Sequence, residues 1–390
     1  YPDLGGMGGA ESVVVWTAAG LRRRGHEVRL FTRRFDAGLW GETRLSGADA
    51  ERVEPCRRGG RLERGLRTGA DLAPRLRAFD VLLAHNRYGL LWALPAGAPV
   101  CWYCHEPSRL LYLRQTDAFL VEALARTDVD PLHPALLHAR KVLRGQRFPP
   151  HRIWRNARRR KKERELVARA RKVLANSRFN AGNLERALGC SPEVLSPGLP
   201  APAGAAGEGP RKGIAVISGE RPSKNLYGVL AAARELERRG ALPGEVFHVW
   251  GAGTDGPFFR TLLREWGLAV RVVLHGFLDG PSAVRLLARA KLCLFLPLCE
   301  PLGLVGVEAL VRGVPLLASG HGGPAEVLAA CGGGRTVDPL RPDRIADTLE
   351  AMFADPEAMR RAAREAAPKA AERFSLERHL DGLEERISAL

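Results

Sequence analysis

Two glutamates in the C-terminal half of the chain have a spacing that suits ligand binding. Glu300 follows the apolar segment Leu292–Leu296, which is typical of a buried strand, and Glu308 lies in the helical pattern that comes next. Gly303 between them lets the backbone approach a ligand closely, and the first turn of a helix offers its amides to anions and hydroxyls. Each carboxylate oxygen accepts one hydroxyl proton, so the pair suits a vicinal diol. This pattern favours a functional site over two solvated surface glutamates.

Two cations precede this pair in the same half. Arg221 and Lys224 follow the apolar segment 214–218 and come directly before a helical pattern. A guanidinium fork and an ammonium beside the positive end of a helix form a clamp for a diphosphate. By themselves they could equally be ordinary surface cations, but the glutamates on a neighbouring predicted strand favour the clamp.

Three further motifs match known kinds of site less well. Residues 251–256 satisfy G-x-G-x-x-G, but the next expected strand, Val270–Leu274, ends without the acidic residue of a dinucleotide site. Asp128 and Asp130 form a D-x-D pattern with no strand ahead of it, which disfavours a metal site. Residues 101–105 read C-x-x-C-H at the end of a strand pattern. We therefore expect strand cysteines there, not a haem attachment or a redox pair.

Two features of the N-terminal half point toward a ligand. A glycine-rich loop near the start contains Gly5, Gly6, Gly8 and Gly9, where the backbone can come close to a bound molecule. His105 ends an apolar strand pattern, and the carboxyl ends of parallel strands are where such sheets bind ligands. A lone histidine is more often structural, but this location makes a functional role more plausible.

The net charge of +17 is distributed unevenly. Residues 1–200 carry 36 Lys and Arg against 20 Asp and Glu, whereas the remaining residues are nearly balanced. Residues 151–172 are the most basic run and include Ile153 and Trp154. Such a surface suits an anionic membrane face, with a solvated helix as the plain alternative. Nucleic acid is disfavoured as a partner because no aromatic stacking motif accompanies the charge.

The elements that must position these residues alternate between strand and helix patterns in both halves. This alternation predicts an α/β protein with two doubly wound, Rossmann-like domains and a ligand in the cleft between them. An odd count of seven cysteines and apolar runs well below about 20 residues predict reduced thiols, a cytoplasmic location and no spanning helix. The first helical pattern has no strand ahead of it, so we expect that a first strand is missing. The expected divisions are a first domain at 1–195 with a basic helical insertion at 107–171, a linker at 196–212, a second domain at 213–375, and a helix at 376–390 that could return to the first domain.

These residues, taken in order, resemble the retaining, nucleotide-sugar-dependent glycosyltransferases of family 4, which have the GT-B fold. The resemblance extends over nearly the whole chain, although the insertion has no counterpart that we can place. The segments that carry it are Glu300 to Glu308 in an E-x7-E element, the Arg221 and Lys224 pair, Gly251-Ala-Gly253, His275-Gly-Phe277, residues 322–326, residues 176–179, residues 103–109, and the opening glycine loop with Gly25-His26.

The resemblance implies a role for each residue of the donor site. Arg221 and Lys224 would bind the donor diphosphate and stabilise the leaving group, and Glu300 would hold the sugar hydroxyls together with amides near Gly303 and Leu304. Further donor contacts are implied for Glu308 at the ribose, Phe277 near the base, and Gly251. His105 would lie near the transferring sugar, and the loop with Gly5, Gly6, Gly8 and Gly9 near the acceptor. No metal and no cofactor are expected, because the cations and a helix dipole would balance the charge.

The function predicted from these residues is transfer of a hexosyl unit from a nucleoside-diphosphate sugar to a lipid-linked or polysaccharide acceptor, an activity of the EC 2.4 type. The enzyme would be peripheral to the cytoplasmic face of a membrane. Two alternatives remain open. One is a nucleotide-sugar epimerase with the same fold, and the other is a non-catalytic polyanion-binding protein.

Overall fold

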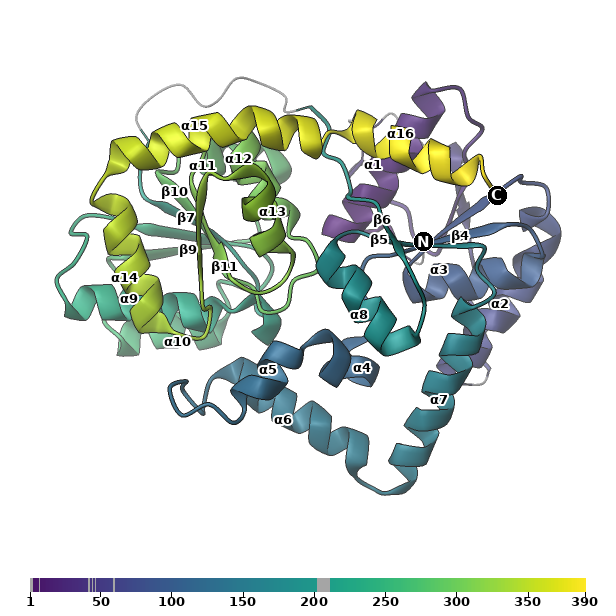
Figure 1. The fold of residues 1–390 in the computed structure, drawn as a ribbon, viewed down its shortest axis with the longest axis horizontal. Helices are drawn as coiled ribbons and strands as arrows, with labels where there is room; N and C mark the ends of the chain where they lie inside the picture. Colours follow the sequence, from purple (N-terminus) through teal and green to yellow (C-terminus); the bar gives the residue numbers. More distant parts are fainter. Residues whose placement is uncertain are drawn as a thin grey trace. The chain divides into compact units, whose positions relative to one another are not determined.

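The computed structural model describes residues 3–6, 8–40, 43, 45, 47–58, 60–201 and 211–390. The chain forms two compact units, each with its own core (Figure 1). Unit 1 comprises Tyr1–Thr116, Gln146–Ala201 and Phe374–Leu390, and unit 2 comprises Asp117–Gly145 and Pro202–Arg373. Most of the predicted linker, residues 202–210, lies outside the described residues, as does Met7 of the opening loop.

Unit 1 contains a parallel sheet of four strands in the order β3-β4-β5-β6, and β1 pairs with β2 in a separate parallel pair. Strand β4 is buried along its whole length, as its apolar sequence predicts. The strands are β1 (Leu30–Thr32), β2 (Ala50–Arg52), β3 (Leu82–His85), β4 (Val100–Cys104), β5 (Lys172–Ala175) and β6 (Glu193–Val194). The helices are α1 (Gly9–Arg23), α2 (Arg61–Leu76), α3 (Asn86–Ala93), α4 (Arg109–Thr116), α7 (His151–Val167), α8 (Arg178–Leu188) and α16 (Leu376–Ile387).

Unit 2 is built on a fully parallel sheet of six strands in the order β12-β11-β10-β7-β8-β9. The strands are β7 (Ile214–Ile217), β8 (Phe247–Trp250), β9 (Val272–Gly276), β10 (Leu292–Phe295), β11 (Leu316–Ser319) and β12 (Gly334–Val337). The helices are α5 (Ala118–Ala123), α6 (Pro134–Arg147), α9 (Leu226–Arg238), α10 (Pro257–Glu265), α11 (Gly280–Ala288), α12 (Leu304–Val311), α13 (Gly323–Cys331), α14 (Pro342–Phe353) and α15 (Pro356–Arg373).

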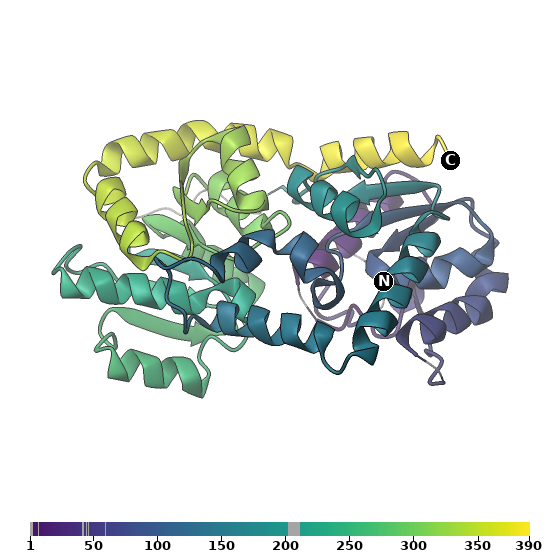
Figure 2. The same ribbon diagram turned by 60° about the horizontal axis from the view of Figure 1, so that its bottom comes forward.

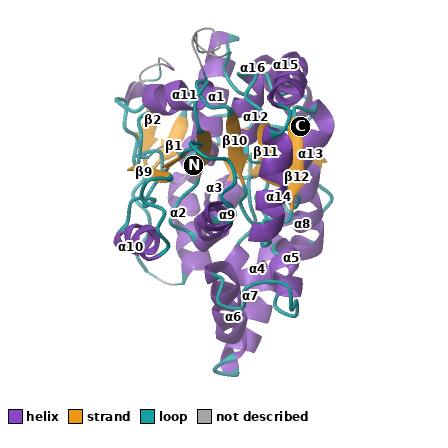
Figure 3. Cartoon of the chain, turned by 90° about the vertical axis from the view of Figure 1, so that its left-hand side faces the viewer, coloured by secondary structure: helices purple, strands orange, loops and turns teal. Residues whose placement is uncertain are grey.

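Helices cover both faces of this sheet, with α9, α10 and α14 on one side and α12, α13 and α15 on the other (Figure 1). Figure 3 shows β10, β11 and β12 with α12, α13 and α14 beside them. The predicted α/β class with two doubly wound domains is therefore confirmed. Strand β12 was not predicted, because three of its four residues are exposed and its sequence has no apolar run.

The last helix, α16, packs on the first helix of unit 1 (Figure 1). Thr17 Oγ1 lies 3.1 Å from His379 Nε2 in this contact, and both side chains are buried. Arg24 also pairs with Glu384 at 2.6 Å. In the part of the chain that the structure describes, no helix is long and apolar enough to cross a membrane.

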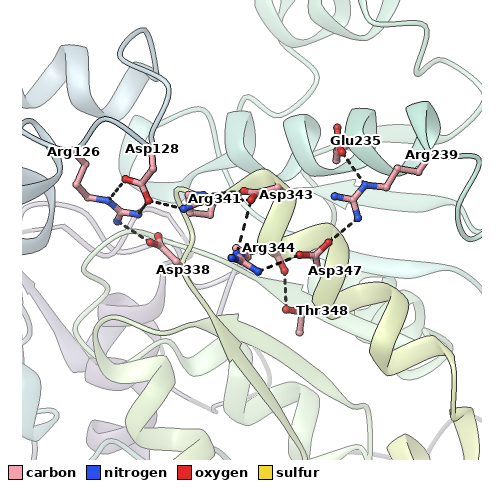
Figure 4. A network of polar contacts seen from close by, with 10 residues as sticks. All are labelled: Arg126, Asp128, Glu235, Arg239, Asp338, Arg341, Asp343, Arg344, Asp347 and Thr348. Atoms are coloured by element: carbon pink, nitrogen blue, oxygen red, sulfur yellow. Dashed lines mark hydrogen bonds and ion pairs between the residues drawn. The ribbon is translucent and has the colours of Figure 1, made fainter.

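Residues 117–145 belong to unit 2, whereas the expected boundaries placed them in an insertion of the first domain (Figure 2). Ion pairs form one part of this contact. Arg126 pairs with Asp338 at 2.7 Å, and Asp128 pairs with Arg341 at 2.5 Å (Figure 4). The network continues along α14 to Arg239, the residue that follows α9 (Figure 4). Because these side chains are partly exposed, water screens each pair, and each contributes little to the stability of the contact.

A ring stack and a buried histidine form the other part of the contact. Phe119 stacks on His321 with ring centroids 3.6 Å apart. His133 is buried, and its Nδ1 accepts a hydrogen bond from Ala135 N, so its Nε2 carries the proton. That Nε2 donates to Asn225 Oδ1 at 3.0 Å. The segment is therefore attached to unit 2 by a buried hydrogen bond and a ring stack as well as by surface ion pairs.

Asn225 joins several elements of unit 2 through one amide. Its Nδ2 donates to Leu296 O at 2.9 Å, beyond β10, and to Pro339 O at 2.8 Å, beyond β12. The residue is 1% exposed and lies at the N-cap of α9 with a φ of 57°. Asparagine tolerates this left-handed conformation better than most residues, and its side chain satisfies two buried carbonyls that would otherwise lack a donor.

Two substitutions of Asn225 should distinguish the stability that comes from its side-chain hydrogen bonds from the stability that depends on its backbone conformation. We expect Asn225→Ala to lower the free energy of unfolding by about 2–4 kcal/mol, because it loses buried hydrogen bonds and strains a left-handed residue. Asn225→Gly should recover about 1 kcal/mol, since glycine relieves only the strain. Urea unfolding monitored by hydrogen exchange of unit 2 measures both. Full recovery by the glycine variant would contradict the role of the hydrogen bonds.

Candidate functional site

Lys224 and Glu300, two of the predicted site residues, meet in unit 2. Lys224 Nζ lies 2.9 Å from Glu300 Oε2. Strands β7 and β10 are neighbours in the sheet, so the loops that follow them begin side by side at its carboxyl edge. Leu298 N donates to Ser223 O at 2.7 Å and joins these two loops directly. The pair is partly exposed, which leaves both charges available to a ligand.

The loop that carries Glu300 is held by backbone contacts on its other side. Glu300 forms a parallel bridge with Gly322, and Gly323 N donates to Glu300 O at 2.8 Å. Helix α12 then begins after Gly303, whose φ is 85° and where a Cβ would lie 2.6 Å from the Phe295 ring. Only glycine fits this position, so the loop can enter α12 sharply and present the amide of Leu304 at the helix start.

Arg221 lines a cavity of about 330 Å³ in unit 2. The guanidinium forms no ion pair within the described residues, so this charge can serve a ligand. Loop 251–256 forms another side of the cavity. Gly251 has a φ of 131°, and a Cβ there would lie 2.1 Å from Ser218 O. The lining residues are His133, Pro134, Glu220, Arg221, Pro222, Leu226, Tyr227, Gly253, Gly256, Pro257, Phe258 and Phe259.

Several lining residues were not predicted from the sequence. Tyr227 is the second residue of α9 and donates its hydroxyl proton to Asp130 at 2.9 Å, and Phe258 is 56% exposed near the start of α10. Aromatic residues at the starts of helices that follow ligand loops could have been recognised. His133 could not, because it lies 92 residues before its partner Asn225 and carries no motif.

Glu308 projects from α12 and is half-buried. Burial raises the pKa of its carboxyl group, while the neighbouring charge of Arg312 lowers it. Within the described residues, its carboxylate has no hydrogen-bond partner. A desolvated acceptor of this kind gains from a ligand hydroxyl, which is the chemistry expected of it.

Phe277 follows the end of β9 and is 65% exposed. Gly276 O accepts a hydrogen bond from Gly251 N at 2.8 Å, so this segment adjoins the glycine loop at the start of the cavity wall. An exposed ring next to that loop can stack on a planar group. The predicted donor residues of unit 2 thus occupy loops along one edge of its sheet, except Leu304 and Glu308, which lie in α12.

His105 lies in unit 1 at the end of β4 and is buried. Its Nε2 lies 3.0 Å from His85 Nδ1, and the two rings stack. Burial is the main cause that lowers the pKa of His105, to about 3, with the charge of His379 as a second cause. The histidine is therefore neutral at physiological pH, so it can interact with a ligand through hydrogen bonds but not as a cation.

The glycine loop of unit 1 leads into α1. Leu4 N donates to Arg34 O at 2.9 Å, and Gly8 is the N-cap of the helix. Gly5 and Gly6 are exposed, as is Gly9, the first residue of α1. Their backbone is thus accessible, as an acceptor-side loop requires.

The motifs that were set aside have structural roles. Cys101 and Cys104 are buried in β4 as free thiols, and burial raises the pKa of both. Asp128 and Asp130 bind Arg341 and Tyr227 as described above. Among the described residues, no group of three or more His, Cys, Asp or Glu side chains could hold a metal ion.

Two parallel-sheet units with ligand loops at the sheet edge are the architecture of GT-B proteins. HepE of Anabaena, in a structure with UDP and glucose, is 18% identical over 100% of this chain and 98% of its own, with a TM-score of 0.73. WaaG, described as a glycosyltransferase involved in lipopolysaccharide biosynthesis, has a TM-score of 0.63 at 17% identity, over 98% of this chain and 96% of its own. These likenesses concern the fold.

The family follows from the sequence models. "Glycosyltransferase Family 4" matches residues 7–200 and "Glycosyl transferases group 1" matches residues 207–370. The chain therefore belongs to the family 4 glycosyltransferases. The alpha-D-kanosaminyltransferase of Streptomyces kanamyceticus is 31% identical, but the match spans only 39% of each protein. The D-inositol 3-phosphate glycosyltransferase of Rhodococcus opacus (strain B4) is 28% identical over 98% of this chain and 86% of its own.

The buried histidines should make unit 1 sensitive to acid. Burial lowers the pKa values of His85, His105 and His379 below the usual 6.5, with His379 at about 4. Each is neutral when folded but takes up a proton when unfolded, so stability is complete above pH 6.5 and is lost as the pH falls. We expect a loss of about 1–2 kcal/mol per histidine between pH 7.5 and 5.

Denaturant unfolding of unit 1 across this range measures the effect. His105→Asn should reduce the pH dependence of the unfolding free energy by the contribution of about one histidine. His151→Asn, which changes an exposed histidine of α7, should leave the pH dependence unchanged. An equal dependence in wild type and His105→Asn would be inconsistent with a buried, neutral His105.

Proposed function

We propose that this protein is a retaining hexosyltransferase that moves a sugar from a nucleoside-diphosphate donor to a lipid-linked or polysaccharide acceptor. The observation that carries the proposal is the Lys224–Glu300 ion pair at the carboxyl edge of the six-stranded sheet. A cation and a carboxylate held together suit a ligand that offers a phosphate and a hydroxyl at the same point. Membership of family 4 supports the same reaction class.

The charged groups would act where charge develops during transfer. The bond between the anomeric carbon and the diphosphate oxygen breaks, and a bond to the acceptor oxygen forms on the same face of the sugar. The acceptor proton passes to the departing diphosphate. Lys224 and Arg221 would stabilise the negative charge on that diphosphate, and Glu300 would orient the sugar through its hydroxyls.

The remaining predicted residues would complete donor and acceptor binding. Glu308 would accept hydrogen bonds from the ribose, since its half-buried carboxylate has no partner within the described residues. Phe277 would stack near the base, and the amides at Gly303 and Leu304 would bind sugar oxygens. His105 and the loop from Gly5 to Gly9 would serve the acceptor side. HepE was determined with UDP and glucose, so UDP-glucose is the first donor to test.

Substituting either member of the ion pair should strongly reduce transfer without unfolding the protein. We expect Lys224→Ala and Glu300→Gln each to reduce transfer by about 100- to 1,000-fold, because each removes charge stabilisation or orientation at the reacting centre. Thermal-shift assays with UDP-, GDP- and ADP-sugars should show which nucleotide sugar stabilises the wild type. Lys224→Ala should reduce the increase in melting temperature that UDP causes.

The matched control is Glu245→Gln. It breaks an equivalent ion pair, with Lys291, at the amino ends of strands β8 and β10 in the same unit. This variant should retain wild-type transfer. Wild-type rates in both site variants would refute the assignment, and conversion of the donor to another sugar without any acceptor would identify an epimerase instead.

We further propose that the protein binds the anionic face of a membrane through α7. Ile153 and Trp154 are 52% and 62% exposed on this basic helix, and Phe148 before it is 62% exposed. Arg158 lies over the Trp154 ring at 3.6 Å. Large apolar side chains among cations fit a lipid interface, where each cation contributes about 1 kcal/mol.

Vesicle sedimentation tests this second proposal. We expect the protein to sediment with vesicles that contain phosphatidylglycerol, to sediment less with pure phosphatidylcholine, and to dissociate as salt rises. Trp154→Gln should weaken the binding several-fold, whereas Val270→Ser, which changes an exposed apolar residue of unit 2, should not. Equal binding to both vesicle types would rule out an anionic lipid site.

A further inference from the structure

Lys224 is followed directly by a residue with an unusual backbone conformation. Asn225 has a φ of 57°, in the left-handed region, and is the N-cap of α9. Before it, Pro222–Lys224 form a short 3-10 helix in which Lys224 N donates to Arg221 O at 2.8 Å. The conformation of Asn225 therefore sets the direction in which the chain leaves Lys224 and enters α9. The orientation of Lys224 thus depends on what holds Asn225.

The backbone of Lys224 is also held from the side of the sheet. Ser218, the residue after β7, donates from its Oγ to Lys224 O at 2.9 Å. At the other end of the lysine side chain, Nζ lies 2.9 Å from Glu300 Oε2. The base of this side chain is thus fixed by Ser218 on one side and by Asn225 on the other. A shift of the backbone at either point would displace the ammonium group.

The side-chain oxygen of Asn225 has an uncommon partner. An asparagine at an N-cap commonly accepts a hydrogen bond from an amide in the first turn of its helix. Asn225 makes no such bond in the described structure, and its Oδ1 lies 3.0 Å from His133 Nε2 instead. Gly228, the third residue of α9, leaves room for this amide, since a Cβ there would lie 2.6 Å from Asn225 Oδ1. Without His133, the oxygen would be free to turn toward the helix amides and would move Asn225 with it.

His133 can serve Asn225 only as a hydrogen-bond donor. Its Nδ1 accepts from Ala135 N at 3.2 Å, which leaves the ring proton on Nε2. Burial is the main cause that lowers the pKa of His133, so the ring takes up no second proton at physiological pH. The Tyr227 ring meets it edge-on, with ring centroids 5.2 Å apart. The imidazole is therefore held in one orientation and one tautomer, with its N–H directed at Asn225.

We propose that His133 is a positioning residue for sugar transfer and acts on Lys224 through Asn225. The proposal rests on the transferase function proposed above and adds a residue from the segment 117–145 to the same site. By holding Asn225 Oδ1, His133 keeps the base of the Lys224 side chain where its ammonium group can meet the departing diphosphate. A displacement of about 1 Å at a reacting centre can cost about a hundredfold in rate, so this support matters for the reaction.

Two replacements of His133 separate its two hydrogen bonds. Asparagine carries an acceptor near the position of Nδ1, so His133→Asn keeps the bond from Ala135 N and loses the donor to Asn225. Glutamine reaches the position of Nε2, so His133→Gln keeps the donor and loses the other bond. We expect His133→Asn to lower kcat about 10- to 100-fold and His133→Gln to retain kcat within about threefold. The KM for the donor should change by less than about threefold in both, because Lys224 keeps its charge.

A double-mutant cycle with Lys224→Ala tests the route through the lysine. If His133 acts by positioning Lys224, then adding His133→Asn to Lys224→Ala should lower kcat by less than about a further threefold, because the cation that it positions is already absent. A residue that only stabilises the fold, or that touches the substrate itself, would lower kcat by the same factor in both backgrounds. Equal factors would therefore overturn the proposal.

The matched control is Asp128→Asn in the same segment. This variant weakens the exposed ion pairs with Arg126 and Arg341 and leaves the contact between His133 and Asn225 intact. It should retain wild-type kcat. All rates are measured well below the melting temperature of each variant, so that unfolded protein does not lower the apparent kcat. If His133→Asn does not fold, His133→Met takes its place, since methionine fills a similar volume and also lacks a donor.

The outcomes separate this proposal from the function on which it rests. Wild-type kcat in His133→Asn, or equal losses in His133→Asn and His133→Gln, would overturn the positioning role. An equal loss in Asp128→Asn would also overturn it, because attachment of the segment alone would then explain the effect. Wild-type transfer by Lys224→Ala would instead contradict the proposed transferase function, whatever the His133 variants do.

Discussion

The organisation of unit 2 depends on the hydrogen bonds of one buried side chain, Asn225. Its amide reaches the chain beyond β10, the chain beyond β12, and His133 of the segment 117–145. It also begins α9, next to Lys224. Because water does not reach the interior, each of these groups would be left without a hydrogen-bond partner if the amide moved. Leaving them unpaired would cost more stability than losing a surface ion pair. The position of Lys224 is thereby coupled to the packing of a distant segment.

This coupling explains why a segment from the middle of the N-terminal half contributes to the cavity beside Arg221. His133 lines that cavity and binds Asn225, while Tyr227 lines it and binds Asp130. The segment thus supplies part of the cavity wall and, through the same residues, its attachment. The exposed ion pairs around Arg341 help to align the segment with α14, but they add little stability.

Much of the fold could be predicted from the sequence, because buried parallel strands leave short apolar runs such as Leu292–Leu296. The proximity of Lys224 and Glu300 also follows from strand order, since ligands bind where neighbouring parallel strands end. The exposed strands β6 and β12 carry no such pattern. The attachment of residues 117–145 to unit 2 could not be predicted from the sequence either, because it depends on single polar contacts between residues that are far apart in sequence.

The basic run in residues 151–172 shows a second limit of sequence reasoning. The sequence gives the charge of this run. Only the structure shows which of its residues lie near other helices and which are exposed to solvent. Arg159 lies near Arg87 and Glu163, whereas Ile153 and Trp154 are exposed. One helix therefore carries two surfaces of different character, and a composition average cannot distinguish them.

The discontinuous makeup of unit 1 also constrains the order in which the protein can fold during synthesis. Helix α16 packs on α1, yet it follows every strand of unit 2 in the chain. When the ribosome has translated the whole six-stranded sheet, the face of α1 that carries Thr17 and Gly20 still lacks the cover of His379 and Leu380. Unit 1, which is made first, is therefore completed last, while Val14 and Ala18 on the other face of α1 are covered earlier by Leu30 and Trp40.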